Sequence, residues 1–569
     1  MLMYDLVIRG GEIIDGTGGE PFQGDVAMAG GKIVAIGRFD GRGGEEIDAR
    51  GKIVTPGFID IHTHYDGQVA WEACLQPSSW HGVTTVIGGN CGVGFAPCKP
   101  AERDLLVKLM EGVEDVPEIV MTTGLPWTWE SFDEYLNFLE QRKFDIDFGA
   151  QIPHSPLRVY VMGERGSNRE PATAADNAEM TRLVEAAVRA GAFGVTTSRH
   201  IMHRSKDGRI APSVDAAELE LLALAEGLKR AGAGVYQIIP ALDCPPAEEY
   251  ALMTRLTEAS GRPLSFSLLA MPRHETWWRD YLNLMDRAQP AAAPIRAQIY
   301  PRPVGVMYGL DLSFHPFSLK PSYRPIANLP LAQRVAEMRK PEMRAKLLAE
   351  KSDDPNPLHL QIVNENIKLY FLGDPPCYNP PKDAEIGLEA ARRGVSKAEL
   401  LYELLLENDG KALLYSPASN YLGNSMAPIQ ELLDNQNTVL GLGDGGAHYG
   451  MICDASYSTF TLMHWVRDAR PGNGIPLAEA VKKLAADPAA CVGLNDRGVI
   501  AIGKKADLNL IDIDQLSLGA PAVIHDLPGG GRRLRQHSKG YVATVVNGDV
   551  TYRDGVSTGA LPGRLVRRS

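Results

Sequence analysis

The chain has 569 residues, 44% of them hydrophobic and 22% charged, which is typical of a folded globular protein and excludes a disordered or collagen-like one. A net charge of −12 argues against nucleic acid as a partner. No apolar stretch approaches the ~20 residues of a membrane-spanning helix, so we also expect no membrane partner. Seven irregularly spaced cysteines suit a reducing compartment, and we expect a cytoplasmic protein.

Alternation of apolar and polar residues predicts short strands at both ends of the chain. Near the start they are residues 4–8, 12–14, 25–28 and 32–36. Near the end they are residues 499–502, 507–511, 541–546 and 549–552. Neither set can bury a core alone, so we expect residues 1–56 and 498–569 to pair into one small β domain.

Residues 57–497 change to short apolar strands that alternate with helical segments. The predicted strands are 58–62, 84–88, 148–152, 194–197, 234–239, 264–269, 296–300 and 438–442. The predicted helices include 176–189, 216–230, 246–259 and 454–467. Eight strands in this alternation predict a (β/α)₈ TIM-like barrel with a parallel sheet.

A long segment, residues 301–437, separates the seventh predicted strand from the eighth. It is too long for a loop and is predicted to form a mostly helical insertion. Because it follows the carboxyl end of a barrel strand, it would overhang the active-site face. A structural or oligomerisation insert is an equal alternative, so we leave formation of a homo-oligomer open.

The first barrel strand ends in His62-Thr63-His64. Residues two apart on a strand point to the same side, so both imidazoles would project together at the barrel mouth. Imidazole nitrogen is a common ligand of Zn²⁺. A pair of polar residues at a strand end is the ordinary alternative, but the neighbouring Asp60 and Asp66 favour a metal site.

Asp444 ends the last predicted strand, within Gly-Asp-Gly-Gly-Ala-His. In a closed barrel the eighth strand adjoins the first, which would bring Asp444 to His62 and His64. A carboxylate there can ligate the metal and accept a proton from an activated water. The alternative is a simple Asp-Gly turn, which the strand position disfavours.

Cys91 follows the second predicted strand in Gly-Gly-Asn-Cys-Gly-Val-Gly. A thiolate beside a divalent ion can bind it, and the surrounding glycines indicate close approach of a ligand. A buried, inert cysteine is the common alternative.

Six segments of the sequence resemble a known family. The opening DLVIRGGEIIDGTG, the segment GKIVTPGFIDIHTH and the late NDRGVIAIGKKADLNLID are similar to the amidohydrolase superfamily. Within it, GNCGVG, PHSPLRVYVMG and DGGAH resemble the branch of D-aminoacylases, or N-acyl-D-amino-acid deacylases. The resemblance spans nearly the whole chain and implies a barrel flanked by a β-sandwich built from both termini, with metal-dependent hydrolysis of an amide.

The resemblance also implies roles for single residues. His62, His64 and Cys91 would be metal ligands, and Asp444 would be both a ligand and the general acid/base. His154 and Arg158 match a motif after the third strand and would support the site from behind.

The chain departs from the family at two metal-binding positions. Family members carry a histidine at the ends of strands five and six, where this chain has Gln237 and Ser267. Neither is a good Zn²⁺ ligand, and strand four offers no lysine to bridge two metals. We therefore expect one Zn²⁺ site rather than two, formed by His62, His64 and Asp444 with Cys91.

Other histidines lie at the predicted barrel mouth. His200 and His203 follow strand four and could complete a rewired metal site, although a substrate-binding or surface role fits them better. His448 could contact substrate or orient Asp444 through a hydrogen bond.

Substrate contacts are also expected from larger side chains. Tyr300 could donate a hydrogen bond to an oxyanion or a substrate carboxylate. Arg199 and Arg302 could clamp a carboxylate or could be ordinary ion-pair partners. The pairs Trp127/Trp129 and Trp277/Trp278 could line an acyl pocket, although core packing is the commoner role of tryptophan.

These residues favour a metal-dependent hydrolase of a small-molecule amide, similar to an N-acyl-D-amino-acid deacylase. A second hypothesis keeps the chemistry but changes the substrate to a cyclic or larger hydrophobic amide or carbamate. A third, of another class, is a degenerate barrel that serves as a binding or assembly scaffold. The absence of the two family histidines favours the scaffold, whereas the survival of His62, His64, Cys91 and Asp444 together favours an enzyme.

Overall fold

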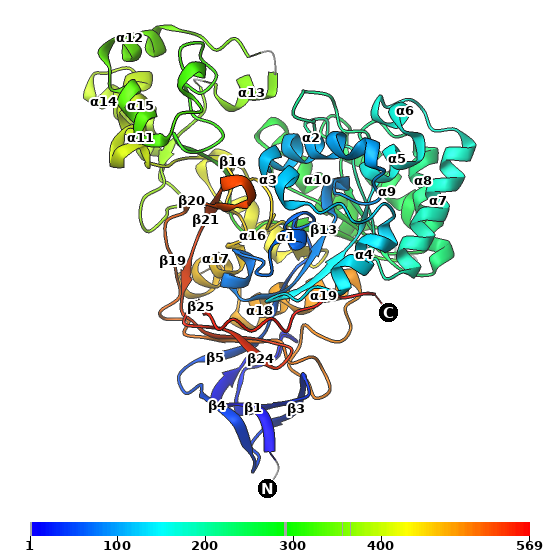
Figure 1. Ribbon diagram of the computed structural model, residues 1–569. Helices are drawn as coiled ribbons and strands as arrows, with labels where there is room; N and C mark the ends of the chain where they lie inside the picture. Colours follow the sequence, from blue (N-terminus) through cyan, green and yellow to red (C-terminus); the bar gives the residue numbers. More distant parts are fainter. Residues whose placement is uncertain (1–2, 289–292, 355–356, 365, 471, 569) are drawn as a thin grey trace.

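The computed structural model describes residues 3–288, 293–354, 357–364, 366–470 and 472–568. Strands from both ends of the chain share one nine-stranded sheet in the order β25-β24-β23-β18-β5-β1-β2-β3, with β4 paired to β1 (Figure 1). The first five are β1 (Met3–Ile13), β2 (Phe22–Ala29), β3 (Lys32–Gly37), β4 (Arg42–Asp48) and β5 (Ile53–Pro56). The last four are β18 (Leu508–Ile511), β23 (Tyr541–Val546), β24 (Asp549–Arg553) and β25 (Val556–Ser557).

The join between the two ends is the antiparallel pairing of β5 with β18, from Ile53 opposite Ile511 to Pro56 opposite Leu508. Alternate side chains of the strands from both ends pack into one cluster that includes Ile8, Val54 and Leu510. The alternating apolar residues of both ends of the chain therefore pack into a single shared core.

Two details of this region differ from the sequence prediction. Residues 499–502 form turns rather than a strand, because Gly498 and Gly503 at their ends both have positive φ. Their alternation reflects a buried Ile500 and an exposed Ile502 in a loop. The strand β4 was not predicted, because its sequence is charged and rich in glycine.

The middle of the chain forms two parallel sheets. One has the order β6-β7-β8 and the other β17-β13-β12-β11-β10-β9. Their strands are β6 (Phe58–Asp60), β7 (Val83–Gly88), β8 (Asp147–Ala150), β9 (Ile152–Pro153), β10 (Gly194–Ser198), β11 (Val235–Ile239), β12 (Leu264–Ser267), β13 (Ile295–Ile299) and β17 (Thr438–Leu440). Only Gln151 separates β8 from β9, and its backbone N–H donates to Gly88 O at 3.0 Å, so the two sheets adjoin there.

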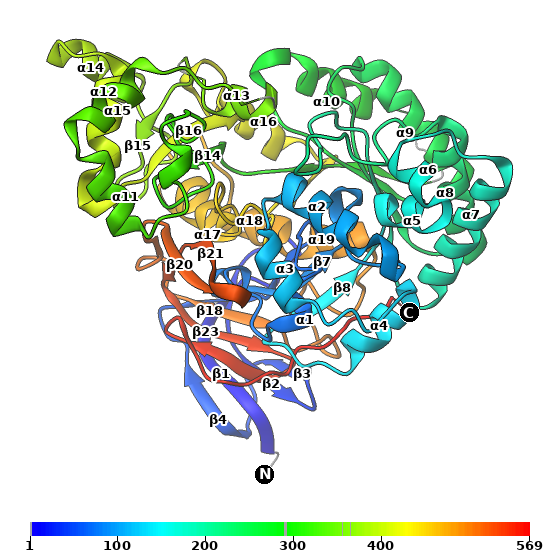
Figure 2. The same cartoon turned by 45° about the horizontal axis from the view of Figure 1, so that its top comes forward.

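Helices follow these strands and cover their outer side (Figure 2). They are α1 (Gln68–Trp71), α2 (Arg103–Glu114), α3 (Glu118–Gly124), α4 (Phe132–Glu140), α5 (His154–Met162), α6 (Glu164–Ser167), α7 (Ala174–Arg189), α8 (Glu218–Ala231), α9 (Pro246–Ser260), α10 (Trp277–Arg287), α18 (Leu477–Leu484) and α19 (Ala486–Val492). The helix predicted at 454–467 is shorter, with α17 (Tyr457–Phe460) running into a π-helical segment, Thr461–Arg467. No described helix has the length and apolar character needed to cross a membrane. The chain thus has an α/β fold.

The segment 301–437 contains both helices and strands. Its helices are α11 (Leu331–Met338), α12 (Pro341–Ala349), α13 (Pro357–Ile362), α14 (Ile386–Arg393), α15 (Lys397–Leu405) and α16 (Ala427–Asp434). Its antiparallel sheet consists of β14 (Val304–Tyr308), β16 (Leu414–Ser419) and β15 (Tyr370–Phe371). A separate apolar cluster supports it, and α11–α15 lie on the opposite side of the molecule from α7 and α8 (Figures 1 and 2).

A buried ion cluster ties β8 to the loop that leads into β18. Arg497 Nη1 lies 2.5 Å from Asp147 Oδ2 and 3.8 Å from Asp507 Oδ2, and Lys505 also pairs with Asp147. Arg497 and both carboxylates are almost fully buried. The cluster therefore connects the parallel sheets to the sheet formed by the termini.

Replacing Arg497 should destabilise the protein strongly. The Arg497→Ala variant leaves two buried carboxylates with one lysine, and breaking such a pair costs about 3–5 kcal/mol. We expect a clearly lower midpoint of urea unfolding, followed by circular dichroism. The control, Arg182→Ala, removes an exposed helical pair with Glu179 and should cost about 0.5 kcal/mol or less. Equal midpoints for the two variants would contradict this role of the cluster.

Candidate metal centre

The ends of β6 and β17 are joined by backbone hydrogen bonds just beyond the two strands. His64 N donates to Gly445 O at 2.7 Å, and Asp444 N donates to His62 O at 3.1 Å. Gly446 permits this approach, since its φ is 88° and a Cβ on it would lie 2.7 Å from the His64 carbonyl. The pairing places the Asp444 side chain beside both imidazoles.

The side chains of His62, His64, Cys91 and Asp444 converge. Asp444 Oδ1 lies 3.6 Å from Nε2 of His62 and 3.6 Å from Nε2 of His64. Cys91 Sγ lies 3.4 Å from His62 Nε2. Bonds of 2.0–2.3 Å to tetrahedral Zn²⁺ put neighbouring donor atoms about 3.3–3.6 Å apart, so this set fits a divalent cation.

Both ring nitrogens of His64 are buried without a hydrogen-bond partner. Buried polar atoms in native proteins are nearly always paired. An imidazole with two unpaired nitrogens beside a thiol and a carboxylate is therefore suited to bind a metal ion. Donor atoms of His62, His64 and Cys91 all lie within 4.8 Å of one another, and no other such group of three occurs among the described residues.

The backbone at the site adopts conformations that ordinary residues rarely take. Cys91, Asp444 and His448 have φ of 55°, 48° and 53°, in the left-handed region. Such residues tend to gather at functional sites, where surrounding structure holds them in place. Here these conformations direct the three side chains toward one cavity.

His62 is oriented from behind by a glutamine. Its Nδ1 donates to Gln298 Oε1 at 2.7 Å, and Gln298 Nε2 donates to Ser265 Oγ at 3.0 Å. With Nδ1 carrying the proton, Nε2 presents its lone pair to Cys91 and Asp444. This is the usual support for a metal-binding histidine.

The structure adds Glu114, which the sequence analysis missed. Its Oε1 lies 3.5 Å from His64 Nδ1 and its Oε2 lies 3.5 Å from His448 Nε2. Glu114 is the last residue of α2 and is only 1% exposed. It belongs to no motif, and no feature of the sequence distinguishes it from other acidic residues near helix ends.

Burial and neighbouring charges set the protonation of the cluster. Burial lowers the pKa of His62 to about 4 and raises that of Cys91 to about 12. Burial also opposes ionisation of His64 and Asp444, but mutual attraction outweighs it: carboxylates around His64 raise its pKa, and imidazoles around Asp444 lower its pKa. A cation must displace protons from Cys91 and His64 to bind, so metal binding here is coupled to proton release.

The two positions at which the chain departs from the family carry no strong metal donor. Gln237 on β11 is 1% exposed, and neither polar atom of its side chain has a partner. Ser267 at the end of β12 lines the cavity with its hydroxyl unpaired. The structure therefore leaves these positions without strong donors.

The cluster forms one wall of a cavity of about 220 Å³. The other walls come mostly from the loops after β11 and β12 and from α10. Apolar side chains dominate them, namely Val113, Ile239, Pro240, Ala241, Leu242, Leu268, Leu269, Met271, Trp277, Trp278, Tyr281, Val304 and Leu442. Val304 is the one lining residue from the segment 301–437 among the described residues.

The predicted histidines His200, His203 and His448 all line this cavity. The rings of His200 and His203 are 4.9 Å apart, and His203 Nδ1 bonds to Ser198 Oγ at 2.8 Å. Burial lowers the pKa of His200 to about 4 and that of His203 well below its usual value. Both imidazoles are therefore neutral at pH 7.

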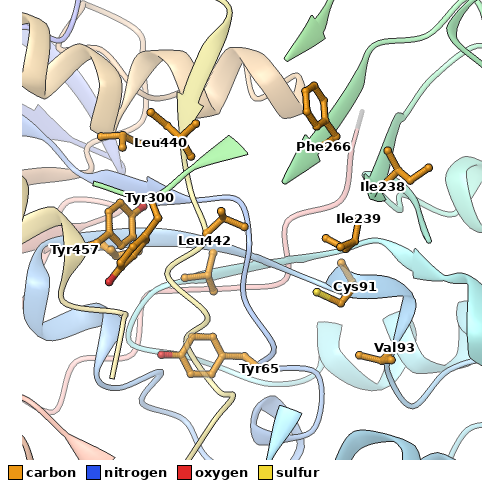
Figure 3. Close-up of a cluster of buried hydrophobic side chains, with 14 of the residues drawn as sticks. Tyr65, Cys91, Val93, Ile238, Ile239, Phe266, Tyr300, Leu440, Leu442 and Tyr457 are labelled. Carbon is orange, nitrogen blue, oxygen red and sulfur yellow. The ribbon is translucent and has the colours of Figure 1, made fainter. Parts of the chain in front are cut away.

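Two predicted substrate contacts lie elsewhere. Tyr300 is fully buried; its hydroxyl donates to Asp454 O at 2.8 Å and accepts from Arg302 at 2.8 Å, away from Cys91 (Figure 3). Arg199 pairs with Glu249 at 2.9 Å and faces a different surface hollow. The strand pattern alone could not show that Tyr300 is buried by contacts with Arg302 and Asp454.

The other candidates divide between core and cavity. Arg302 is buried against Asp454 at 3.1 Å. His154 and Arg158 share the buried Glu220, at 2.9 and 2.7 Å, and do not line the cavity. Trp127 and Trp129 pack in an aromatic cluster, whereas Trp277 and Trp278 line the cavity.

Comparison with known proteins identifies the family. Residues 45–552 match the amidohydrolase family. The chain belongs to the amidohydrolase family. An N-acyl-D-aspartate deacylase of Alcaligenes xylosoxydans xylosoxydans is 28% identical, covering 99% of this chain and 95% of the relative. An N-acyl-D-glutamate deacylase of the same organism is 26% identical, covering 99% and 96%.

The fold of this amidohydrolase is similar to the folds of solved deacylase structures. A D-aminoacylase structure has a TM-score of 0.64 at 22% identity, covering 99% of this chain and all of the other. An N-acyl-D-glutamate deacylase from Bordetella bronchiseptica, complexed with zinc and a phosphonate inhibitor, has a TM-score of 0.65 at 22% identity and the same coverage. The resemblance found in the sequence is confirmed: the chain is an amide-hydrolysing enzyme, and the scaffold alternative is not favoured.

The support of His62 by Gln298 can be tested through zinc affinity. Gln298→Ala removes the acceptor for His62 Nδ1–H, and such losses weaken metal binding about 10–100-fold. Gln298→Glu keeps an acceptor and should stay within about threefold of wild type. Zinc competition with a chromophoric chelator measures both. Equal affinity of Gln298→Ala and wild type would show that the hydrogen bond does not position the ligand.

Proposed function

We propose that this amidohydrolase is a metal-dependent deacylase that hydrolyses the amide bond of an N-acylated D-amino acid or a close derivative. The observation that carries the proposal is the convergence of His62, His64, Cys91 and Asp444 on one wall of an apolar cavity. Similarity to two deacylases over almost the whole chain supports the choice of amide and of acyl-amino-acid substrate.

We also propose that the two parallel sheets, with β8 and β9 counted as one strand, close into an eight-stranded (β/α)₈ barrel spanning residues 57–497. The hydrogen bonds between His62–His64 and Asp444–Gly445 support closure between β6 and β17. Residues 1–56 and 498–569 would then form the attached β-sandwich. The seven cysteines, all free, support a reducing compartment such as the cytoplasm.

One divalent cation, Zn²⁺ in our proposal, would be held by His62, His64 and Asp444 with Cys91. Gln237 and Ser267 support a single site, because neither supplies the nitrogen donor that a second ion would need. A cation bound here would polarise the substrate carbonyl and make an attacking water more acidic.

Asp444 is suited to move the proton. Its Oδ1 faces the two histidines, while its Oδ2 lies 4.0 Å from His448 Nε2 and so points toward the cavity side of the cluster. Asp444 accepts a proton as water adds to the amide carbon, and it returns that proton to the nitrogen as the C–N bond breaks. The products are a carboxylic acid and a free amine.

Glu114 and His448 act as positioning residues. The Glu114 carboxylate lies between His64 and His448, and the backbone N–H of His448 also bonds to Glu114 O. This holds His448 over Asp444 and fixes the ring of His64. A carboxylate behind a ligating histidine also increases its donor strength.

The test combines metal content with hydrolysis of paired N-acetyl-D- and N-acetyl-L-leucine amides and acids by the zinc-loaded enzyme. We expect about one zinc per chain, turnover of the D series, and a fall in kcat of about 10²–10⁴-fold in Asp444→Asn. Asp514→Asn, an exposed site, is the matched control and should keep full activity.

Two results would contradict the proposal. Two tightly bound zinc ions per chain would show that further residues act as ligands, with His200 and His203 the first to replace. Full activity of Asp444→Asn with its zinc retained would exclude Asp444 as the acid/base.

A further inference from the structure

The charged side chains of the cavity wall do not suit a substrate that carries a free carboxylate. Among the described residues that line it, the charged side chains are the carboxylates Glu114 and Asp444, and none is lysine or arginine. The histidines His200 and His203 are neutral at pH 7, because burial lowers the pKa of each. The wall therefore offers no lysine or arginine to pair with a substrate carboxylate.

None of the arginines within two residues of a lining residue belongs to the wall. Arg199 is paired with the buried Glu249, and Arg302 with the buried Asp454. Arg279 is paired with the exposed Glu431, and Arg204 Nη1 donates to Gly208 O at 3.0 Å. Arg273, between the lining residues Met271 and His274, is exposed and is not part of the wall. A bound carboxylate would thus lose water without gaining a lysine or arginine as an ion-pair partner, which is costly in a buried site.

A bound metal ion would not replace the missing cation. Cys91 as a thiolate and Asp444 as a carboxylate would together bring two negative charges to a divalent ion, and Glu114 adds a third behind His64. The net field at the cavity wall would remain unfavourable for a further anion.

The remaining surface is suited to uncharged apolar groups. Trp278 and Tyr281 are buried on the cavity face of α10, and the half-buried Trp277 stacks on His274 at 3.7 Å between ring centroids. Leu269 and Ile239 extend this surface from the loops after β12 and β11. A volume of about 220 Å³, below the roughly 300–1,000 Å³ of typical ligand pockets, favours a compact apolar ligand.

We propose that the substrate of this enzyme is an uncharged, compact acylated amine: an N-acyl-D-amino-acid derivative whose carboxyl group is masked as an amide or ester. The inference rests on the proposed deacylase function and sharpens its specificity. The relatives named for N-acyl-D-aspartate and N-acyl-D-glutamate act on compounds with two carboxylates, so this chain would have changed the polarity of its substrate.

Binding separates this inference from catalysis. The probes are N-methylsulfonyl-D-leucine and its N-methylamide, which mimic an acylated amino acid but lack an amide carbonyl at the acyl position. Isothermal titration of the zinc-loaded wild-type enzyme should show the neutral N-methylamide binding at least about tenfold more tightly, as expected when one ligand carries an unpaired buried charge. Equal or tighter binding of the free acid would overturn the inference.

A designed cation provides a second, independent test. Leu269→Arg introduces a guanidinium at the cavity wall and should shift the binding ratio toward the free acid by about tenfold. Leu269→Gln, the neutral polar control, should leave the ratio within about twofold of wild type. A shift of equal size in both variants would mean that charge does not govern the preference.

Arg273 supplies the remaining control. Arg273→Ala should leave the ratio of the two affinities unchanged, since this side chain lies outside the wall. A further tenfold loss of acid binding in Arg273→Ala would identify it as a carboxylate partner and overturn the inference. If instead the neutral probe binds preferentially while no N-acyl-D-leucine derivative is hydrolysed, the specificity stands and the deacylase proposal fails.

Discussion

The backbone hydrogen bonds between His62–His64 and Asp444–Gly445 are the contacts on which the site depends. They bring together residues that lie some 380 positions apart in the sequence, and they hold the Asp444 carboxylate equally far from two imidazoles. The close approach requires glycine at position 446, where any side chain would meet the His64 carbonyl. The backbone therefore sets the positions from which the side chains of His62, His64 and Asp444 converge.

Around this centre the protein keeps charge on one side of the cavity and apolar surface on the other. Glu114, Asp444 and the histidines form the first wall, and aromatic side chains of α10 form the second. This division suits amide hydrolysis. The apolar wall excludes bulk water from the cavity, and the polar wall can accept and return the proton of the attacking water. The same division leaves an anionic substrate without a partner.

Much of this could be predicted from the sequence where local patterns carry the information. The parallel strands in the middle of the chain, the shared sheet of the two termini and the convergence of His62, His64, Cys91 and Asp444 follow from period-two alternation, strand-end positions and family resemblance. Glu114 could not be found, because only tertiary packing brings the end of α2 to His64.

Tyr300 and Arg199 were expected to contact substrate but do not line the cavity, and the reason is similar for both. Tyr300 comes directly after β13, but its side chain is fully buried and its hydroxyl bonds to Asp454 O and Arg302. Arg199 directly follows β10, but it forms an ion pair with Glu249 of α9. Strand position predicts which end of a sheet a side chain occupies, whereas neighbours distant in the sequence decide whether it reaches the cavity.

The sheet shared by the two ends of the chain affects the order in which its strands can pair during synthesis. Strand β5 finds its neighbour β18 only after about 450 further residues have been made, which at roughly 5–20 residues per second takes on the order of half a minute or more. During that interval the edge of β5 is open, and Ile53 and Val54 wait without the partner strand that later covers them. Strand β5 therefore acquires its neighbour β18 late in synthesis, and until then its open edge can associate with other strands.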